Sequence, residues 1–119
     1  MLQTVRFDLA GGNDVVTNRT AAPIRADCGD GNDTLNGGPA NDLLTDSRGS
    51  DRLRGNGGSD SLFTDGPTDS APDVLEGGPG DDDLRANAGN DQLLGGDGSD
   101  VLRAGSVPTT STVAPGWIP

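Results

Sequence analysis

The chain has 119 residues, of which 30% are hydrophobic, and its 19 acidic and eight basic residues give a formal net charge of −11. So low a hydrophobic content predicts disorder unless something outside the sequence adds stability. The acidic balance argues against nucleic acid and anionic membrane surfaces as partners. No apolar run could span a membrane, and the single Cys28 excludes an intrachain disulfide and offers no zinc-type spacing.

Residues 1–27 are interpreted as an N-terminal cap, made of a strand and a degenerate first turn. The first strand alternates apolar and polar side chains, so Val5, Phe7 and Leu9 are predicted to form a half-buried face. Further on, Ile24 stands where the later pattern has a leucine, and it is predicted to reach the core.

Residues 28–103 carry a sequence period of nine, with one insertion at 64–72. Each nine opens with glycines or other turn-forming residues, has Asp in the sixth place, and has Leu in the eighth place. Eight of the 18 aspartates and eight of the 12 leucines fall at these two phases. Biased composition alone does not produce such phasing, which indicates a repeat architecture.

Each nine predicts a tight turn followed by a short strand. Glycine and small polar residues suit the turn, and the x-Leu-x ending points leucine inward and its neighbours outward. Two nines return the chain to its start, one strand spacing along. The predicted fold is therefore all-β, a parallel β-roll (β-solenoid) of stacked 18-residue turns, each made of two nonapeptide units. Residues 104–119 leave the pattern and are interpreted as a Pro/Thr/Ser-rich tail.

Stacking would place the sixth-place aspartates in two ladders, one along each edge of the solenoid. Carboxylates one strand spacing apart repel one another, and divalent cations between the rungs would turn that repulsion into cross-linking. Calcium suits such a site better than magnesium, because it accepts six to eight oxygens in loose geometry. We therefore expect the chain to be largely unfolded without calcium. The two ladders are Asp33, Asp51, Asp73 and Asp91, and Asp42, Asp60, Asp82 and Asp100.

The nines at 77–85 (GGPGDDDLR) and 95–103 (GGDGSDVLR) match the pattern GGxGxDxUx, in which U is a large aliphatic residue. In this the chain resembles the RTX (hemolysin-type) calcium-binding repeats. The resemblance implies a parallel β-roll with calcium between stacked loops. The sixth-place Asp of both loops and backbone carbonyls from the first four places would bind the ion.

Carried onto this chain, the resemblance puts the best site between the loops at 77–82 and 95–100. Asp73 and Asp14 are the weakest candidates. The loop before Asp73 has gained prolines, and Asp14 lacks a partner loop in phase. The implied metal ligands are Asp33, Asp42, Asp51, Asp60, Asp82, Asp91 and Asp100, with the loop residues Gly77, Gly78, Pro79, Gly80, Gly95, Gly96, Asp97 and Gly98.

The resemblance also implies a function, that of a calcium-dependent folding or structural module in a secreted bacterial protein with further domains. We expect no enzyme, because the repeated carboxylates are accounted for as ligands and the chain has no histidine. Three alternatives stay open: a solenoid with metal-free Asn/Asp ladders, a module of a carbohydrate-active enzyme, and an adhesin. Cys28 stands where the repeat has glycine and is interpreted as sequence drift.

Overall fold

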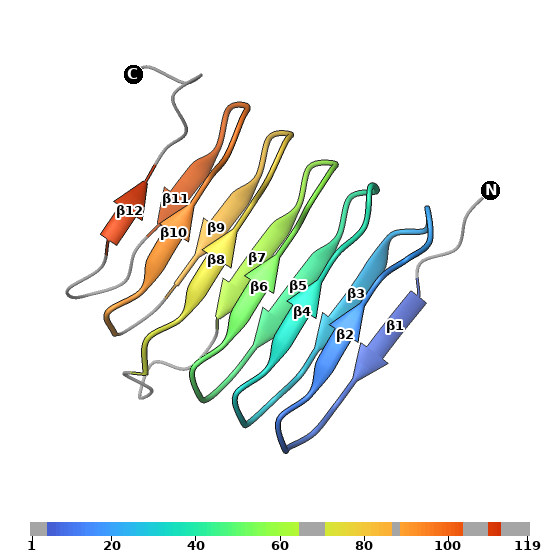
Figure 1. Ribbon diagram of the computed structural model, residues 1–119, viewed down its shortest axis with the longest axis vertical. Coiled ribbons are helices and arrows are strands. Elements are labelled where there is room, and N and C mark those ends of the chain that lie inside the picture. The colour runs from blue at the N-terminus through green and yellow to red at the C-terminus, as the bar shows by residue number, and fades with distance from the viewer. Residues whose placement is uncertain (1–4, 65–70, 87–88, 104–109, 113–119) are drawn as a thin grey trace.

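The chain forms two parallel β-sheets that run side by side along a solenoid (Figure 1). The computed structural model describes residues 5–64, 71–86, 89–103 and the backbone of 110–112. The odd sheet contains β1 (Val5–Asp8), β3 (Ile24–Asp27), β5 (Leu43–Asp46), β7 (Ser61–Thr64), β9 (Asp83–Arg85) and β11 (Val101–Arg103). The even sheet contains β2 (Val15–Thr17), β4 (Thr34–Asn36), β6 (Arg52–Arg54), β8 (Val74–Glu76), β10 (Gln92–Leu94) and β12 (Thr110–Thr112).

A stripe of leucines between the two sheets forms the core. The eighth-place leucine is the middle or second residue of its strand, and alternation along the strand turns it inward. Neighbouring turns pair in register at these leucines, as Leu35 does with Leu53 and Leu44 with Leu62. The leucines from Leu35 to Leu93 at this place are fully buried, and Leu102 packs partly buried at the end of the stripe. The predicted all-β solenoid of 18-residue turns is confirmed.

The insertion leaves the sheets undisturbed. Leu53 pairs with Leu75, 22 residues further on, so the extra residues lie entirely in the loop between β7 and β8. Most of the predicted insertion, residues 65–70, is outside the described residues. Within the predicted tail, only the backbone of β12 is described, and it pairs in parallel with β10. The described residues contain no helix of the length and apolarity that a membrane span requires.

At the N-terminal end, the strand is confirmed but its predicted half-buried face is wrong. All four residues of β1 are exposed, with Val5 at 43% and Phe7 at 37%. Leu9 alone of the predicted face is partly buried against the core. Since β1 is the outermost described strand of the odd sheet, no described turn covers the side chains that point toward the solenoid axis.

The degenerate turn at 18–27 contributes to the core, but its strand pairs with the next turn in a different register from the one predicted. Ala26 pairs with Leu44, so Ala26, and not Ile24, holds the eighth place. Ile24 holds the sixth place, where its backbone N–H donates to Asp42 Oδ1 at 2.8 Å. Both side chains are buried. An apolar residue has thus replaced an aspartate at the end of one ladder while the backbone bond of that place is kept.

Candidate metal sites on the two edges

The loops between the sheets form two edges that differ in the first residue of each nine. From residue 28 on, the loops that lead from the even sheet to the odd sheet begin with glycine; we call these the glycine edge, along the upper side of Figure 1. Loops that lead from the odd sheet to the even sheet begin with another residue; we call these the substituted edge. The first-place residues are Gly37, Gly55, Gly77 and Gly95 on the glycine edge, and Cys28, Asp46, Thr64 and Ala86 on the substituted edge.

Both edges carry the predicted ladder of buried aspartates. Along the glycine edge, the backbone N–H of Asp42 donates to Asp60 Oδ1, that of Asp60 to Asp82 Oδ1, and that of Asp82 to Asp100 Oδ1, each at 2.8 Å. The substituted edge repeats this arrangement from Asp33 through Asp51 and Asp73 to Asp91. The sequence placed these eight residues correctly. All eight are at most 9% exposed.

Asp14 also belongs to a ladder, contrary to the expectation that it lacks a partner loop in phase. Its backbone N–H donates to Asp33 Oδ1 at 2.6 Å, and the neighbouring Gly11 forms a parallel bridge with Asp30. The two turns are offset by 19 residues instead of 18, so the 18-residue period did not predict this alignment. The ladder of the substituted edge therefore reaches back to the first described turn.

On the glycine edge, the second carboxylate oxygen of each aspartate packs closely against the first-place glycine of its own nine. Oδ2 of Asp60, Asp82 and Asp100 is buried and accepts no hydrogen bond. A Cβ placed on Gly77 would lie 2.5 Å from Asp82 Oδ2 and 2.7 Å from the carbonyl oxygen of Gly95 in the next turn. A first-place side chain therefore has no space here, and the glycine lets a carboxylate oxygen and a carbonyl oxygen from successive turns approach each other, which are the donor types that calcium takes.

The loop backbone on this edge requires glycine at its tip as well. Gly98 has φ +113°, a conformation that other residues rarely adopt. A Cβ there would collide with the carbonyl oxygen of Gly80 in the preceding turn. The loops therefore stack backbone against backbone. Among the predicted loop residues, Gly77 and Gly95 are buried, whereas Pro79 and Asp97 are exposed at the tip.

Burial makes the ionised form of these carboxylates costly in the folded chain. It raises the pKa of Asp60 to about 8 and that of Asp82 to about 6, and ladder neighbours of like charge add to both. The pKa of Asp42 and of Asp100 is raised by burial too. At neutral pH, the chain can stay folded only if protons or cations neutralise this row of buried carboxylates. The buried Oδ2 atoms, with carbonyl oxygens of the next turn nearby, fit a cation.

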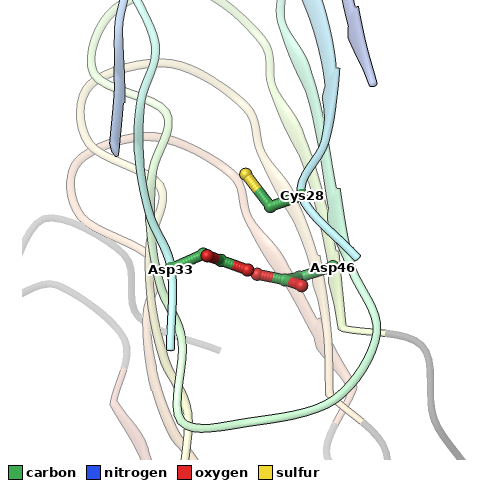
Figure 2. A group of neighbouring side chains, drawn as sticks. All are labelled: Cys28, Asp33 and Asp46. Atoms are coloured by element: carbon green, nitrogen blue, oxygen red, sulfur yellow. The ribbon is translucent and has the colours of Figure 1, made fainter. Parts of the chain in front are cut away.

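On the substituted edge, side chains occupy the first place. Thr64 is buried, and its hydroxyl hydrogen-bonds to Asp73, which partly offsets the burial that raises the Asp73 pKa to about 7. Ala86 fills the place with a methyl group that is 5% exposed. Cys28 and Asp46 lie buried beside Asp33, as Figure 2 shows. The first place, which carries no side chain on the glycine edge, thus carries one on this edge.

Sequence reasoning missed two features. One is a second ladder in the fifth place, where Asn or Asp side chains accept backbone N–H groups of the next turn: Ser59 to Asn41 Oδ1 at 2.8 Å and Ser99 to Asp81 Oδ1 at 2.9 Å. Its signal is the repeated Asn or Asp before the sixth-place Asp. The other is Asp46, a buried acid outside the sixth place, whose only signal was a missing first-place glycine.

The fold and the two ladders define a class, the parallel β-solenoids whose stacked loops present carboxylates in register. A family model described as RTX calcium-binding nonapeptide repeat (4 copies) matches residues 29–66 and 68–106. The chain therefore belongs to the RTX calcium-binding nonapeptide repeat family, and calcium is the metal that its repeats bind. A search of curated proteins and a search of solved structures each gave no significant match.

Proposed function

We propose that the sixth-place aspartates of the glycine edge bind calcium between successive loops, and that this binding drives the chain to fold. The observation that carries the proposal is the row of buried Oδ2 atoms without a hydrogen-bond partner, each beside a first-place glycine. Four loops leave three intervals. The ions would lie between Asp42 and Asp60, Asp60 and Asp82, and Asp82 and Asp100, with carbonyl oxygens of the glycine loops completing each shell.

The interval between loops 77–82 and 95–100 is the best of the three. Both loops keep glycine in the first, second and fourth places, and Oδ2 of both aspartates lacks a hydrogen bond. In the first interval, Asp42 Oδ2 already accepts the N–H of Gly38 at 2.8 Å. An ion there must displace that bond, so the C-terminal interval should fill first.

On the substituted edge, Asp33, Asp51 and Asp91 keep the sixth-place geometry, and Asp73 and Asp14 extend their ladder. First-place side chains take up room that an ion needs, so calcium binds this edge more weakly. The insertion next to Asp73 and the 19-residue offset at Asp14 weaken those two positions further.

We further propose that the chain works as a calcium-dependent structural module outside a bacterial cell. Proteins with these repeats are typically extracellular and bacterial. Extracellular calcium modules have dissociation constants of about 10⁻⁴–10⁻³ M, which keep them unfolded in a cytosol poor in calcium and folded after export. In this proposal residues 1–27 cap the N-terminal end, 28–103 form the repeats, and 104–119 form a tail.

A calcium titration of the full chain tests the proposal. Circular dichroism should change from an unfolded to a β spectrum as calcium rises to millimolar concentrations, and calorimetry should count about three tight ions, one per interval. Magnesium at the same concentration should leave the chain unfolded. A full β spectrum at neutral pH in excess chelator would show that the ladders need no metal and would overturn the proposal.

A further inference from the structure

The substituted edge holds a second group of buried donor atoms, formed by Cys28, Asp33 and Asp46. The thiol sulfur and one carboxylate oxygen from each aspartate all lie within 4.8 Å of one another. All three residues are buried, with Cys28 at 0% exposure and both aspartates at 1%. In Figure 2 the two carboxylates point toward each other from opposite sides of the turn, and Cys28 lies next to them.

Each carboxylate is held by one oxygen and leaves the other without a partner. Asp33 Oδ1 accepts the backbone N–H of Asp14 at 2.6 Å, and Asp46 Oδ1 accepts that of Ser47 at 2.7 Å. Oδ2 of both residues is buried and accepts no hydrogen bond. Two facing carboxylate oxygens away from water repel each other unless a proton or a cation lies between them.

The three residues meet because of their places in the repeat. Cys28 and Asp46 hold the first place of nines that are 18 residues apart, so they stack on the same edge. Asp33 holds the sixth place of the same nine as Cys28. On the glycine edge, a Cβ in the first place would touch the sixth-place Oδ2 of its own nine, as at Gly77 and Asp82. A first-place side chain is therefore aimed at the ladder carboxylate.

We propose that Cys28, Asp33 and Asp46 bind one thiophilic divalent cation of the zinc class, at a site separate from the calcium sites of the glycine edge. Thiolate sulfur does not suit calcium, whereas zinc takes sulfur and carboxylate oxygen together in four-coordinate sites. Three protein donors leave a fourth position for water or a backbone carbonyl. Tetrahedral zinc bonds set donor atoms about 3.5 Å apart, so binding draws these side chains slightly closer.

The same first place in the other described turns of this edge lacks this donor set. Thr64 presents a hydroxyl that bonds Asp73, and Ala86 presents only a methyl group. The proposed site is therefore confined to the turns of Cys28 and Asp46. Cys28, which stands where the repeat has glycine, would then have a function, because it supplies the one sulfur ligand among the described residues.

Cobalt(II), a spectroscopic substitute for zinc, tests the proposal. The full chain is refolded in saturating calcium, and cobalt is then titrated in. We expect a thiolate-to-cobalt charge-transfer band that saturates at one equivalent and is abolished by one equivalent of zinc. Cys28→Gly and Asp46→Gly, which restore the repeat's own residue, should remove the band and weaken zinc binding on the order of 100-fold, with the calcium-induced β spectrum retained.

Ala86→Gly is the matched control, because it changes the same place on the same edge and should leave the cobalt spectrum unaltered. If Cys28→Gly fails to fold in calcium, Cys28→Ser keeps the side-chain volume and decides the same question. Absence of the band at one equivalent, or a band of full intensity in Cys28→Ser, overturns the proposal. The β spectrum of the same samples reports on calcium binding separately, so failure of either proposal is recognised by itself.

Discussion

The two edges of this solenoid carry the same ladder of buried aspartates and differ in one place of the repeat. On the glycine edge, the first place has no side chain, and Oδ2 of Asp60, Asp82 and Asp100 beside it is buried without a hydrogen bond. On the substituted edge, Thr64 donates a hydrogen bond to Asp73, and Ala86 fills the same place with a methyl group. The chain thus supplies compensation at Asp73, whereas Oδ2 of Asp33 on the same edge and of Asp82 on the glycine edge are buried without a hydrogen bond.

The difference teaches that the ladder alone does not make a calcium site. Backbone N–H groups satisfy one oxygen of each aspartate on both edges in the same way. The first-place residue satisfies the second oxygen at Asp73, where Thr64 donates to the carboxylate, and on the glycine edge no first-place side chain is present to do so. A first-place side chain also lies where the carboxylate and carbonyl oxygens of the glycine edge meet, so the glycine edge should respond to calcium more strongly than the substituted edge.

The largest expected effect is the pH dependence of the calcium-free chain. Burial raises the pKa of Asp60 to about 8 and that of Asp82 to about 6, whereas an unfolded Asp has a pKa of about 3.9. Between these values the folded state binds more protons, so its stability falls as pH rises from about 4 to about 8. In excess chelator, the β spectrum should be strongest near the acid end of this window and lost at the alkaline end. A signal that does not vary over the window would contradict the assigned burial.

Next in size is the difference between Asp60→Asn and Asp73→Asn, one on each edge. Asparagine keeps Oδ1 as the ladder acceptor and removes the charge. In Asp60→Asn we expect the calcium concentration at half-saturation to rise at least about 100-fold, or about 2.7 kcal/mol, because two intervals share this residue. Asp73→Asn should change it by less than about threefold, equivalent to under about 0.7 kcal/mol. Calorimetric titration measures both.

In chelator the same pair should act in the opposite direction. Asp60→Asn removes a buried group whose ionisation disfavours folding, so at about pH 8 the calcium-free variant should have more β signal than the parent chain. Asp73→Asn should gain less, because Thr64 already donates to that carboxylate. Equal responses of the two variants would mean that the first place does not distinguish the edges.

The period predicted both ladders and both sheets because each nine repeats one physical unit. Asp60 and Leu62 could be assigned their edge and their strand from phase alone, and the 22-residue step to Asp82 and Leu84 followed once the insertion was recognised. A ladder position needs only a backbone bond to the next turn and a neighbour in register. Both conditions are properties of the repeat length, so the sequence carries them.

Other features depend on contacts that the period does not encode. Ile24 was assigned to the wrong place because a worn turn has no Asp or Leu to fix its register, and only the pairing of Ala26 with Leu44 settles it. The exposure of Phe7 depends on its place at the end of the stack. The approach of Asp46 to Cys28 depends on two unrelated substitutions that stack 18 residues apart, which neither substitution indicates by itself.

Filling one first-place glycine should give a smaller effect. Gly77 does not have a positive φ, so its backbone conformation allows alanine, but the methyl group of Gly77→Ala would lie 2.5 Å from Asp82 Oδ2 and 2.7 Å from the Gly95 carbonyl oxygen, and these oxygens must move apart. We expect calcium binding about tenfold weaker, or about 1.4 kcal/mol, by calorimetric titration. Ala86→Gly makes the reverse change on the substituted edge. It should lower stability by about 0.5–1 kcal/mol and leave the calcium affinity within about twofold, equivalent to under about 0.4 kcal/mol. If Gly77→Ala bound calcium as tightly as the parent chain, Gly77 would not be part of the calcium site.

The smallest expected effect concerns the second place of the glycine edge, where Asn56 replaces the usual glycine. Asn56 has φ +67°, and its side-chain amide donates to the Gly37 carbonyl oxygen at 2.6 Å. Asn56→Gly removes strain of about 1 kcal/mol and a hydrogen bond of about 1 kcal/mol, so its thermal unfolding in calcium should shift by only a few degrees. The freed Gly37 carbonyl lies in the interval between Asp42 and Asp60. If carbonyl oxygens of this edge complete the calcium shell, the calcium affinity of that interval should rise about twofold, about 0.4 kcal/mol. Weaker calcium binding would mean instead that the amide of Asn56 holds the loop in its binding conformation.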